Sequence, residues 1–297
     1  MRVLIVGCGY VGLPLGAELA RQGHEVFGLR RSALAETELK AAGITPLLAD
    51  ITRPETLPPL PRDFDWVVNC TASGGGGAED YRKIYLEGNR NLMAWLAGSP
   101  LKKFIYTSST SVYGQNDGSV VTEQSPVEPD APTSRILVAT EKLLLAAVAE
   151  RNFPAAILRV AGIYGPTRGH SFKAFLRGEA RIEGDGARVL NMIHRDDVIG
   201  AIIAALRAAK PGEIYNAADH EPVSQLNFFK WLAAELKQPM PPVIPADAEA
   251  WRRRGVTNKQ VSNARLRAEL KYEFQFPDFR AGYAAELRRP AGNSPTS

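Results

Sequence analysis

Cysteine, histidine and long apolar runs are all scarce in this 297-residue sequence. Its two cysteines, Cys8 and Cys70, cannot form a disulfide framework, and its four histidines lie too far apart to predict a metal site. No stretch reaches the ~18 apolar residues of a membrane helix, and the apolar run at the N-terminus is too short for a signal peptide. These absences argue against a secreted disulfide-rich module, a metalloprotein and a membrane protein, and we expect a cytoplasmic protein.

A large excess of charge of one sign is also lacking. The formal net charge is +4 and the pI about 9.0. The basic residues are scattered, with one dense cluster at residues 252–254. This distribution favours a small anionic ligand over nucleic acid. The length is that of about two domains, and the apolar fraction of 45% with a charged fraction of 23% is ordinary for a globular protein.

Short runs rich in β-branched residues alternate with stretches of helical periodicity. Residues 3–6 are apolar throughout, as expected of a strand buried on both faces. Val11, Leu15 and Leu19 then recur at helical spacing. The further predicted strands are 25–29, 66–70, 104–107, 156–160 and 214–216; the further predicted helices are 80–97, 135–151, one capped by Asp196 and Asp197, 228–236 and 263–270. The alternation predicts an α/β fold with a doubly wound parallel sheet.

The segment Gly7-Cys-Gly9-Tyr-Val-Gly12 has the form G-x-G-x-x-G, and it follows a predicted strand and opens a predicted helix. That context is typical of a dinucleotide-binding turn. The first glycine permits the tight turn, the second lets the backbone approach a pyrophosphate, and the third permits close helix–strand packing. The helix N-terminus then offers N–H groups to the phosphates. A tight turn without a ligand is the alternative.

The choice of cofactor depends on the end of the second strand, which reads Leu29-Arg30-Arg31-Ser32. An acidic residue there would bind the ribose 2′-hydroxyl of NAD, whereas an arginine accommodates the 2′-phosphate of NADP. The sequence therefore favours NADP over NAD, although two solvated arginines would look the same. Asp50 either lines the adenine or caps a helix. The predicted cofactor-binding residues are Gly7, Gly9, Tyr10, Val11, Gly12, Arg30, Arg31, Asp50, Ile51, Thr71 and Ala72.

Several further segments resemble one family. They are Lys103-Phe-Ile-Tyr-Thr-Ser-Ser-Thr-Ser-Val-Tyr-Gly114, Leu158-Arg-Val-Ala-Gly-Ile-Tyr-Gly-Pro166, Ile193-His-Arg-Asp-Asp-Val198 and Glu213-Ile-Tyr-Asn-Ala217. With the glycine turn, they make the chain similar to the extended short-chain dehydrogenase/reductase superfamily, the NAD-dependent epimerase/dehydratase group. The resemblance implies a Rossmann sheet with a smaller C-terminal substrate lobe. We expect a dinucleotide-binding domain over 1–165, to which 190–220 return, a substrate lobe over 166–189 and 221–289, and a disordered tail over 290–297.

The resemblance also implies a catalytic serine, which falls on Ser109. The family's Tyr-x-x-x-Lys pair is degraded, because a register fixed by Glu141 puts Thr133 at the tyrosine position and Leu137 at the lysine position. An upstream asparagine of the family falls on Tyr85. The chain is therefore identified as an atypical member.

Other residues could supply what is missing. Tyr113 and Tyr164 are the candidate replacement acids, although Tyr113 is mostly structural in the family. On the substrate side, Leu190 stands where nucleotide-sugar enzymes of the family place an arginine. Arg188 and Arg253 are the alternative anion contacts.

Two functions follow from these residues. The first is an NADP-dependent oxidoreductase or epimerase acting on a small hydroxyl or carbonyl compound, with a sugar-derived substrate left open. The second is a non-catalytic NADP-binding redox sensor or regulatory protein, which the missing tyrosine and lysine support. The expected partner is a small-molecule substrate rather than nucleic acid or a membrane, and a homodimer stays open.

Overall fold

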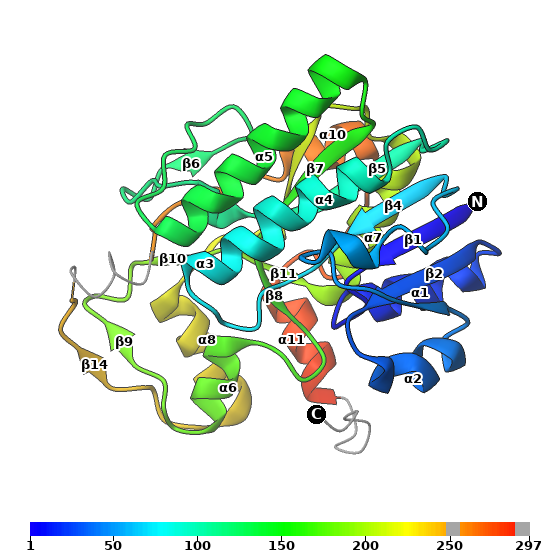
Figure 1. Cartoon of the computed structure of the whole chain (residues 1–297). Helices are drawn as coiled ribbons and strands as arrows, with labels where there is room; N and C mark the ends of the chain where they lie inside the picture. Colours follow the sequence, from blue (N-terminus) through cyan, green and yellow to red (C-terminus); the bar gives the residue numbers. More distant parts are fainter. Residues whose placement is uncertain (248–255, 289–297) are drawn as a thin grey trace. The chain divides into compact units, whose positions relative to one another are not determined.

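The computed structural model describes residues 1–247 and 256–288 (Figure 1). The chain divides into two units. The first comprises Met1–Ser109, Pro132–Arg159 and Ala201–Tyr215; the second comprises Thr110–Ala131, Val160–Gly200 and Asn216–Ser297. These bounds differ from the domains predicted from the sequence, since residues 110–131, 160–165, 190–200 and 216–220 lie with the second unit. The predicted tail over 290–297 falls outside the described residues.

A seven-stranded sheet has the strand order β12-β7-β5-β4-β1-β2-β3. Its strands are β1 (Arg2–Val6), β2 (Glu25–Arg30), β3 (Thr45–Leu48), β4 (Trp66–Asn69), β5 (Lys103–Ser109), β7 (Ala155–Val160) and β12 (Ile214–Ala217). The pairings β1–β2, β2–β3, β1–β4 and β4–β5 are parallel. The predicted doubly wound α/β fold is therefore confirmed. From β1 the chain proceeds to β2 and β3 on one side and then to β4 and β5 on the other, so the order reverses between β1 and β4.

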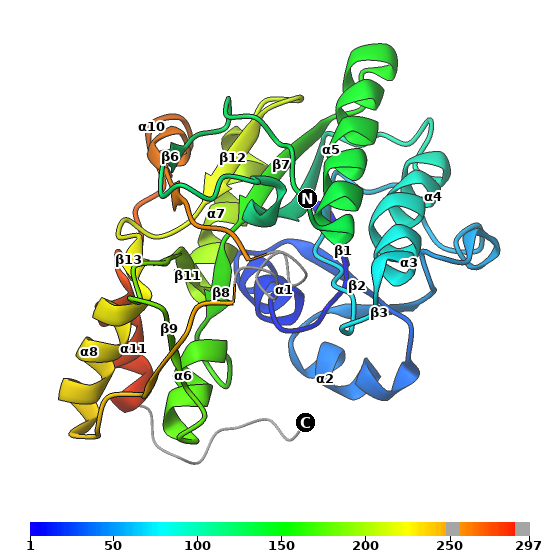
Figure 2. The same cartoon turned by 90° about the vertical axis from the view of Figure 1, so that its left-hand side faces the viewer.

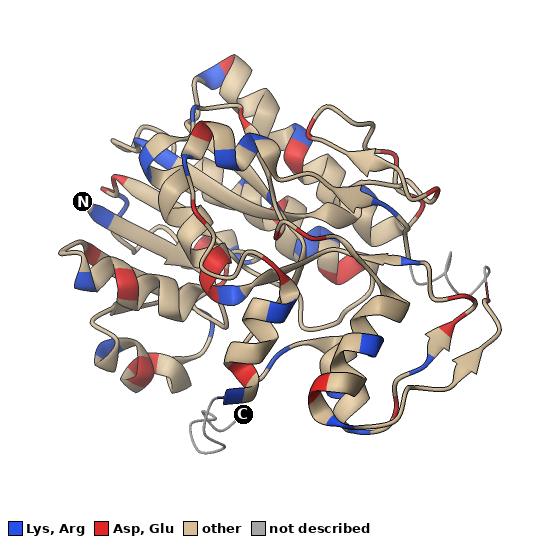
Figure 3. Ribbon diagram, turned by 180° about the vertical axis from the view of Figure 1, so that it is seen from behind, with Lys and Arg blue, Asp and Glu red and all other residues tan. Residues whose placement is uncertain are grey.

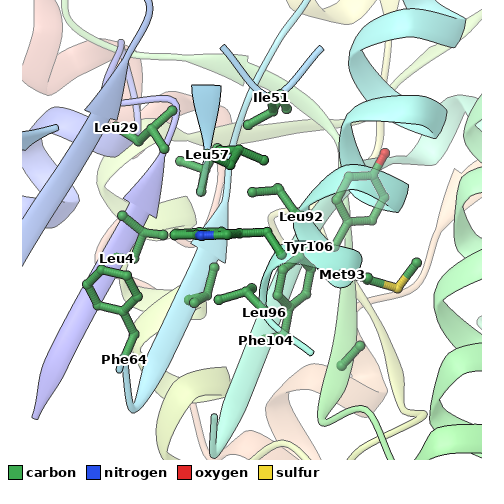
Figure 4. Close-up of a cluster of buried hydrophobic side chains, with 14 of the residues drawn as sticks. Leu4, Leu29, Ile51, Leu57, Phe64, Leu92, Met93, Leu96, Phe104 and Tyr106 are labelled. Carbon is green, nitrogen blue, oxygen red and sulfur yellow. The ribbon is translucent and has the colours of Figure 1, made fainter. Parts of the chain in front are cut away.

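Helices cover both faces of this sheet, as the all-apolar β1 requires. The helices that carry residues of the first unit are α1 (Gly12–Arg21), α2 (Glu36–Ala41), α3 (Ala78–Tyr81), α4 (Gly88–Trp95), α5 (Pro132–Arg151) and α7 (Arg195–Ala208), with short 3₁₀ turns η1 (Ala33–Ala35) and η2 (Pro54–Thr56). Alternate residues of β1 serve the two faces. Leu4 and Val6 join a buried cluster with side chains of α4 and α5 (Figure 4), whereas Ile5 lies against Gly16 of α1. Figure 2 shows α3, α4 and α5 on one side of the strands and α1 on the other.

The predicted helix over 80–97 is interrupted by a different winding. Between α3 and α4 the backbone forms a π-helix, η3 (Arg82–Glu87). A π-helix adds a residue to the turn; such turns are rare in proteins and frequently lie at functional sites. The hydrophobic periodicity predicted the extent of this helix but not the wider turn inside it.

Among its described residues, the second unit contains four two-stranded pairings and a separate aromatic core. The pairs are β6 (Val120–Val121) with β15 (Gln260–Val261), β8 (Gly162–Tyr164) with β11 (Met192–His194), β9 (Ile182–Glu183) with β14 (Val243–Ile244), and β10 (Val189–Leu190) with β13 (Val223–Ser224). Its helices are α6 (His170–Leu176), α8 (Gln225–Leu236), α10 (Ala264–Leu270) and α11 (Phe279–Arg288), with the 3₁₀ turn η4 (Thr110–Val112). The core includes Phe228, Phe229 and Phe279.

The start of α7 corrects one sequence prediction. The helix begins at Arg195, so Asp196 and Asp197 lie in its first turn rather than at its cap. Carboxylates in a first turn still interact favourably with the helix dipole. The Asp197 carboxylate is buried and accepts hydrogen bonds from the Tyr272 hydroxyl at 2.7 Å and from the backbone N–H groups of Gln275 and Phe276. It therefore ties the segment after α10 to α7.

Basic and acidic residues are interspersed along the helices (Figure 3). Among the described residues, no helix is both long and apolar enough to cross a bilayer.

Candidate cofactor and catalytic site

The three glycines of the glycine turn differ in the space that a side chain would have at each position. Gly7 has a φ of +90°, and a Cβ there would lie 2.8 Å from the backbone nitrogen of Thr71. A Cβ on Gly12 would lie 2.3 Å from the carbonyl oxygen of Gly7. A Cβ on Gly9 would meet no atom within 4 Å. The fold therefore needs glycine at positions 7 and 12, whereas Gly9 borders open space.

Helix α1 begins directly after this turn. Its N-cap residue, Val11, has no side chain that could accept a hydrogen bond from the first turn of the helix. N–H groups at a helix N-terminus carry the positive end of the helix dipole and bind phosphate. The turn between β1 and α1 thus has the geometry of a phosphate-binding turn, and phosphate binding there stays a prediction.

Arg30 ends β2 and folds back over the glycine turn. Its guanidinium donates a hydrogen bond to the carbonyl oxygen of Cys8, and the residue is half-buried. Arg31 next to it is exposed. This hydrogen bond holds the Arg30 guanidinium beside the turn. Arg30 is therefore not freely solvated, in contrast to the alternative left open by the sequence.

Asp50 makes local hydrogen bonds within a turn, and it does not cap a helix, because the N-cap of the following 3₁₀ turn η2 is Arg53. Its Oδ1 accepts from the backbone N–H of Thr52 at 2.9 Å and from the Thr52 hydroxyl at 2.8 Å. Ile51 is buried, and its carbonyl oxygen accepts from the Asn91 side chain at 2.8 Å. These bonds stabilise the turn after β3 and leave an adenine contact of Asp50 as a prediction.

The end of β4 is organised by a buried asparagine. Asn69 Oδ1 accepts from the backbone N–H of Thr71 at 3.1 Å and from its hydroxyl at 2.8 Å. Asn69 Nδ2 donates to Asn89 Oδ1 at 3.0 Å. Because β4 lies beside β1, this network places residues 71–73 at the carboxyl edge where the strand order reverses. Ligands bind at that edge in doubly wound sheets.

Ser109 is the last residue of β5, and a buried network secures the strand end on which it lies. The neighbouring Ser108 hydroxyl donates to Glu141 Oε1 at 2.6 Å, and Arg159 donates to Glu141 Oε2 at 2.7 Å. All three are more than nine-tenths buried. In the sequence, Glu141 served only to set the register of the motif. In the structure, its bonds to Ser108 and Arg159 connect α5 with β5 and β7.

Helix α5 carries no replacement for the family's missing pair at the predicted positions. Leu137 is buried and Thr133 is half-buried. An apolar side chain at 137 can neither hold a ligand hydroxyl nor lower the pKa of a neighbouring phenol.

Tyr113 and Tyr164 both lie inside the second unit. The fully buried Tyr113 hydroxyl donates to Asn216 Oδ1 at 2.7 Å. The buried Tyr164 hydroxyl donates to the carbonyl oxygen of Asp278 at 3.4 Å, and its ring stacks on Tyr283 at 4.3 Å. Burial raises the pKa of Tyr164. Both hydroxyl groups are thus engaged in buried hydrogen bonds within the unit. A catalytic role for either stays a prediction.

No motif in the sequence points to Lys259, whose side chain is buried in the second unit. Its Nζ donates to the carbonyl oxygen of Tyr113 at 3.0 Å and to the Thr257 hydroxyl. Burial lowers the pKa of Lys259 to about 8. The ammonium therefore holds the backbone of the segment that follows η4.

The predicted anion contacts on the substrate side have different outcomes. Arg188 is half-buried just before β10, and its carbonyl oxygen accepts from the backbone N–H of Gln225 at 2.8 Å. Arg253 lies outside the described residues. Leu190 lies in β10, and its apolar side chain cannot bind an anion. An anion contact from Arg188 stays a prediction. Within residues 1–247 and 256–288, no group of three potential ligands is placed to hold a metal ion.

Asp219 is a buried acid with an incomplete set of hydrogen bonds. Its Oδ1 accepts from the backbone N–H of Glu221 at 3.2 Å, whereas Oδ2 has no partner among the described residues. Burial, together with the nearby carboxylates of Asp278, Glu221 and Asp197, raises the pKa of Asp219 to about 8. The folded protein therefore keeps a proton that the unfolded chain releases near pH 4.

This proton predicts how stability changes with pH. Because the folded state binds more protons than the unfolded state between about pH 4 and pH 8, this group makes the protein less stable as the pH rises through that window. We expect Asp219→Asn to flatten the fall in Tm between pH 5 and pH 8, and Glu235→Gln, at an exposed position, to leave it unchanged. Thermal melts across this range test it, and an unaltered slope in Asp219→Asn would contradict the assignment.

Comparison with known proteins places this geometry in a family. The sequence model of the NAD dependent epimerase/dehydratase family matches residues 3–218. The chain belongs to this family. The resemblance inferred from the motifs is thereby confirmed.

Similar proteins extend over nearly the whole chain. Protein YeeZ of Escherichia coli K12 is 31% identical over 291 residues, covering 93% of this chain and 97% of YeeZ. A functionally unknown conserved protein from Silicibacter pomeroyi has a similar structure, with a TM-score of 0.78, 28% identity, and coverage of 96% and 98% of the two chains. DesIV, a dTDP-glucose 4,6-dehydratase from Streptomyces venezuelae solved with NAD, has a TM-score of 0.83 at 22% identity, covering 97% of this chain and 96% of DesIV. The last likeness shows the shared fold.

Within the epimerase/dehydratase family, this chain keeps the glycine turn and the serine at the end of β5. In the register inferred from the motifs, Thr133 and Leu137 on α5 stand where the family has its tyrosine and lysine. An enzymatic role therefore requires another hydrogen-bonding group near the carboxyl ends of β4 and β5.

Proposed function

We propose that this protein is a cytoplasmic NADP-dependent oxidoreductase or epimerase that acts on a small hydroxyl or carbonyl compound. The observation that carries the proposal is the position of Arg30, whose guanidinium is held on the carbonyl of Cys8 beside the glycine turn. NADP, when bound, supplies hydride transfer at its nicotinamide ring.

The residues around the turn support the phosphorylated cofactor. Gly9 leaves room for a pyrophosphate, and α1 directs its N–H groups toward the same turn. No carboxylate occurs between Leu29 and Ser32 to accept a ribose 2′-hydroxyl. A guanidinium held in this place matches a 2′-phosphate in charge and in geometry.

We expect Arg30→Ala to weaken binding of NADPH at least about tenfold, because a charge-assisted hydrogen bond contributes about 1.5–3 kcal/mol. Binding of NADH should change by less than about threefold. Arg21→Ala, which removes an exposed arginine paired with Glu18 on the same unit, is the matched control. Fluorescence titration of both cofactors tests the preference, and equal affinities in the wild type would refute it.

On the substrate side, Ser109 is the proposed catalytic residue. Its hydroxyl can both donate to and accept from a substrate oxygen, and the Glu141–Arg159 ion pair stabilises the strand end that carries it. Arg188 is the proposed contact for an anionic substrate group. The sugar-nucleotide enzymes among the similar structures make a sugar-derived substrate one class to screen first.

A second function is supported by one specific observation. Leu137 is buried in α5 where the family has a lysine, so the chain is also suited to a non-catalytic NADP-binding sensor. A panel of sugar-derived ketones and alcohols with bound NADPH or NADP separates the two functions. Turnover on any of them supports the enzyme, whereas tight cofactor binding without turnover supports the sensor.

A further inference from the structure

The topology of the first unit determines which half of a dinucleotide would meet which strands. The strand order reverses between β1 and β4, and a dinucleotide lies across that point. Arg30, at the end of β2, marks the adenosine side. The nicotinamide half then extends over the carboxyl ends of β4 and β5, where residues 71–73 and Ser109 lie.

Tyr85 places a phenolic hydroxyl at this second position. The backbone N–H of Ser73, just beyond β4, donates to the Tyr85 hydroxyl oxygen at 3.1 Å. This bond uses a lone pair of the oxygen and leaves the phenolic proton to be donated elsewhere. The Ser73 side chain also hydrogen-bonds this oxygen, in the sense that lowers the pKa of the phenol, so the oxygen again acts as acceptor. Tyr85 is half-buried, in contrast to the sealed Tyr113 and Tyr164.

The backbone of Tyr85 is fixed independently of its hydroxyl. Tyr85 lies in the π-helix η3, and its carbonyl oxygen accepts from Asn89 Nδ2 at 2.6 Å. Asn89 Oδ1 in turn accepts from Asn69 at the end of β4. Both asparagines are fully buried. The wider turn and the asparagine pair together orient the tyrosine toward the edge of β4 from two directions.

The surroundings keep the hydroxyl protonated. Burial raises the pKa of Tyr85, so near neutral pH it is a neutral donor rather than a phenolate. The Tyr81 ring packs on the Tyr85 ring at 4.9 Å. Helix α5 packs against η3, and its buried Leu137 offers no competing polar group.

We propose that the Tyr85 hydroxyl is a cofactor-binding group that donates a hydrogen bond to the nicotinamide ribose of the dinucleotide. The inference rests on the proposed function, since it presupposes a dinucleotide across the β1–β4 edge. It assigns to η3 the role of holding a ribose hydroxyl, for which α5 has no suitable side chain at position 137.

The test uses the whole protein and three probes: NADPH, reduced nicotinamide mononucleotide and 2′,5′-ADP. Tyr85→Phe removes one oxygen and keeps the ring. Because one hydrogen bond is lost, we expect this variant to bind NADPH and the nicotinamide mononucleotide about five- to tenfold more weakly. Binding of 2′,5′-ADP should stay within about twofold of the wild type. Tyr81→Phe, on the neighbouring ring, should bind all three probes like the wild type.

Each contrary outcome is informative. Wild-type affinity for NADPH in Tyr85→Phe overturns the Tyr85 assignment and leaves the proposed function standing. An equal loss for 2′,5′-ADP, or the same loss in Tyr81→Phe, shows general damage to the unit and also overturns it. Failure of the wild type to bind either NADPH or NADH removes the proposed function, and the ribose contact with it.

Discussion

Replacing Gly9 by valine should abolish binding of NADPH while the protein stays folded. A Cβ at position 9 meets no protein atom within 4 Å, and the residue is exposed, so the fold accommodates the larger side chain. The same volume is the space that a pyrophosphate needs beside the turn. Excluding the phosphates removes at least two charge-assisted hydrogen bonds of about 1.5–3 kcal/mol each, which amounts to a loss of about 100-fold or more.

Gly12→Ala is the matched control, because it adds a methyl group to the same turn with the opposite consequence. Its Cβ would lie 2.3 Å from the carbonyl oxygen of Gly7. We expect this overpacking to cost about 1–3 kcal/mol of unfolding free energy. Thermal melts and NADPH titrations of both variants test the contrast. A folded Gly9→Val protein that still binds NADPH would show that the turn is not the cofactor site.

The parts of this site that the sequence predicted are those that local rules determine. The glycine spacing and the missing carboxylate between Leu29 and Ser32 belong to one strand–turn–helix–strand segment. Such a segment has few possible geometries, so the positions of Gly7, Gly12 and Arg30 could be anticipated from the order of residues alone. The alternating apolar faces of β1 likewise follow from the period of a strand.

The parts that the sequence did not predict depend on contacts between distant residues or on small changes of winding. Lys259 binds the carbonyl of Tyr113 across 146 positions, and no periodicity encodes such a pairing. The π-helix around Tyr85 differs from an α-helix by one residue in a turn, which leaves the apolar pattern of 80–97 nearly unchanged. The start of α7 was also missed by a small amount: the helix begins at Arg195, one residue before Asp196, which the sequence predicted as its cap.

Ser109→Ala should lower the catalytic rate strongly, whereas Thr133→Ala should leave it nearly unchanged. Ser109 lies at the carboxyl end of β5, and open α/β sheets bind their ligands at the carboxyl ends of their strands. Loss of a hydroxyl that orients the substrate and stabilises its oxygen in the transition state lowers the rate about 10²–10³-fold. The reduction should fall mainly on kcat, since the cofactor contacts at the glycine turn and at Arg30 are unaffected.

Thr133, by contrast, stands where the motif register predicts the family's tyrosine, and its hydroxyl cannot replace a phenol. The pKa of an aliphatic hydroxyl is far above that of a phenol, and the buried Leu137 supplies no cation to lower it. Thr133→Ala should therefore keep kcat/KM within about threefold, and its pH–rate profile should match that of the wild type. The measurement is kcat and KM of both variants on the substrate that the screen identifies, with NADPH titrations to show that the cofactor still binds. Full activity in Ser109→Ala, or an inactive Thr133→Ala that binds NADPH normally, would reverse the assignment of these two residues, because the proton-transfer group would then lie on α5.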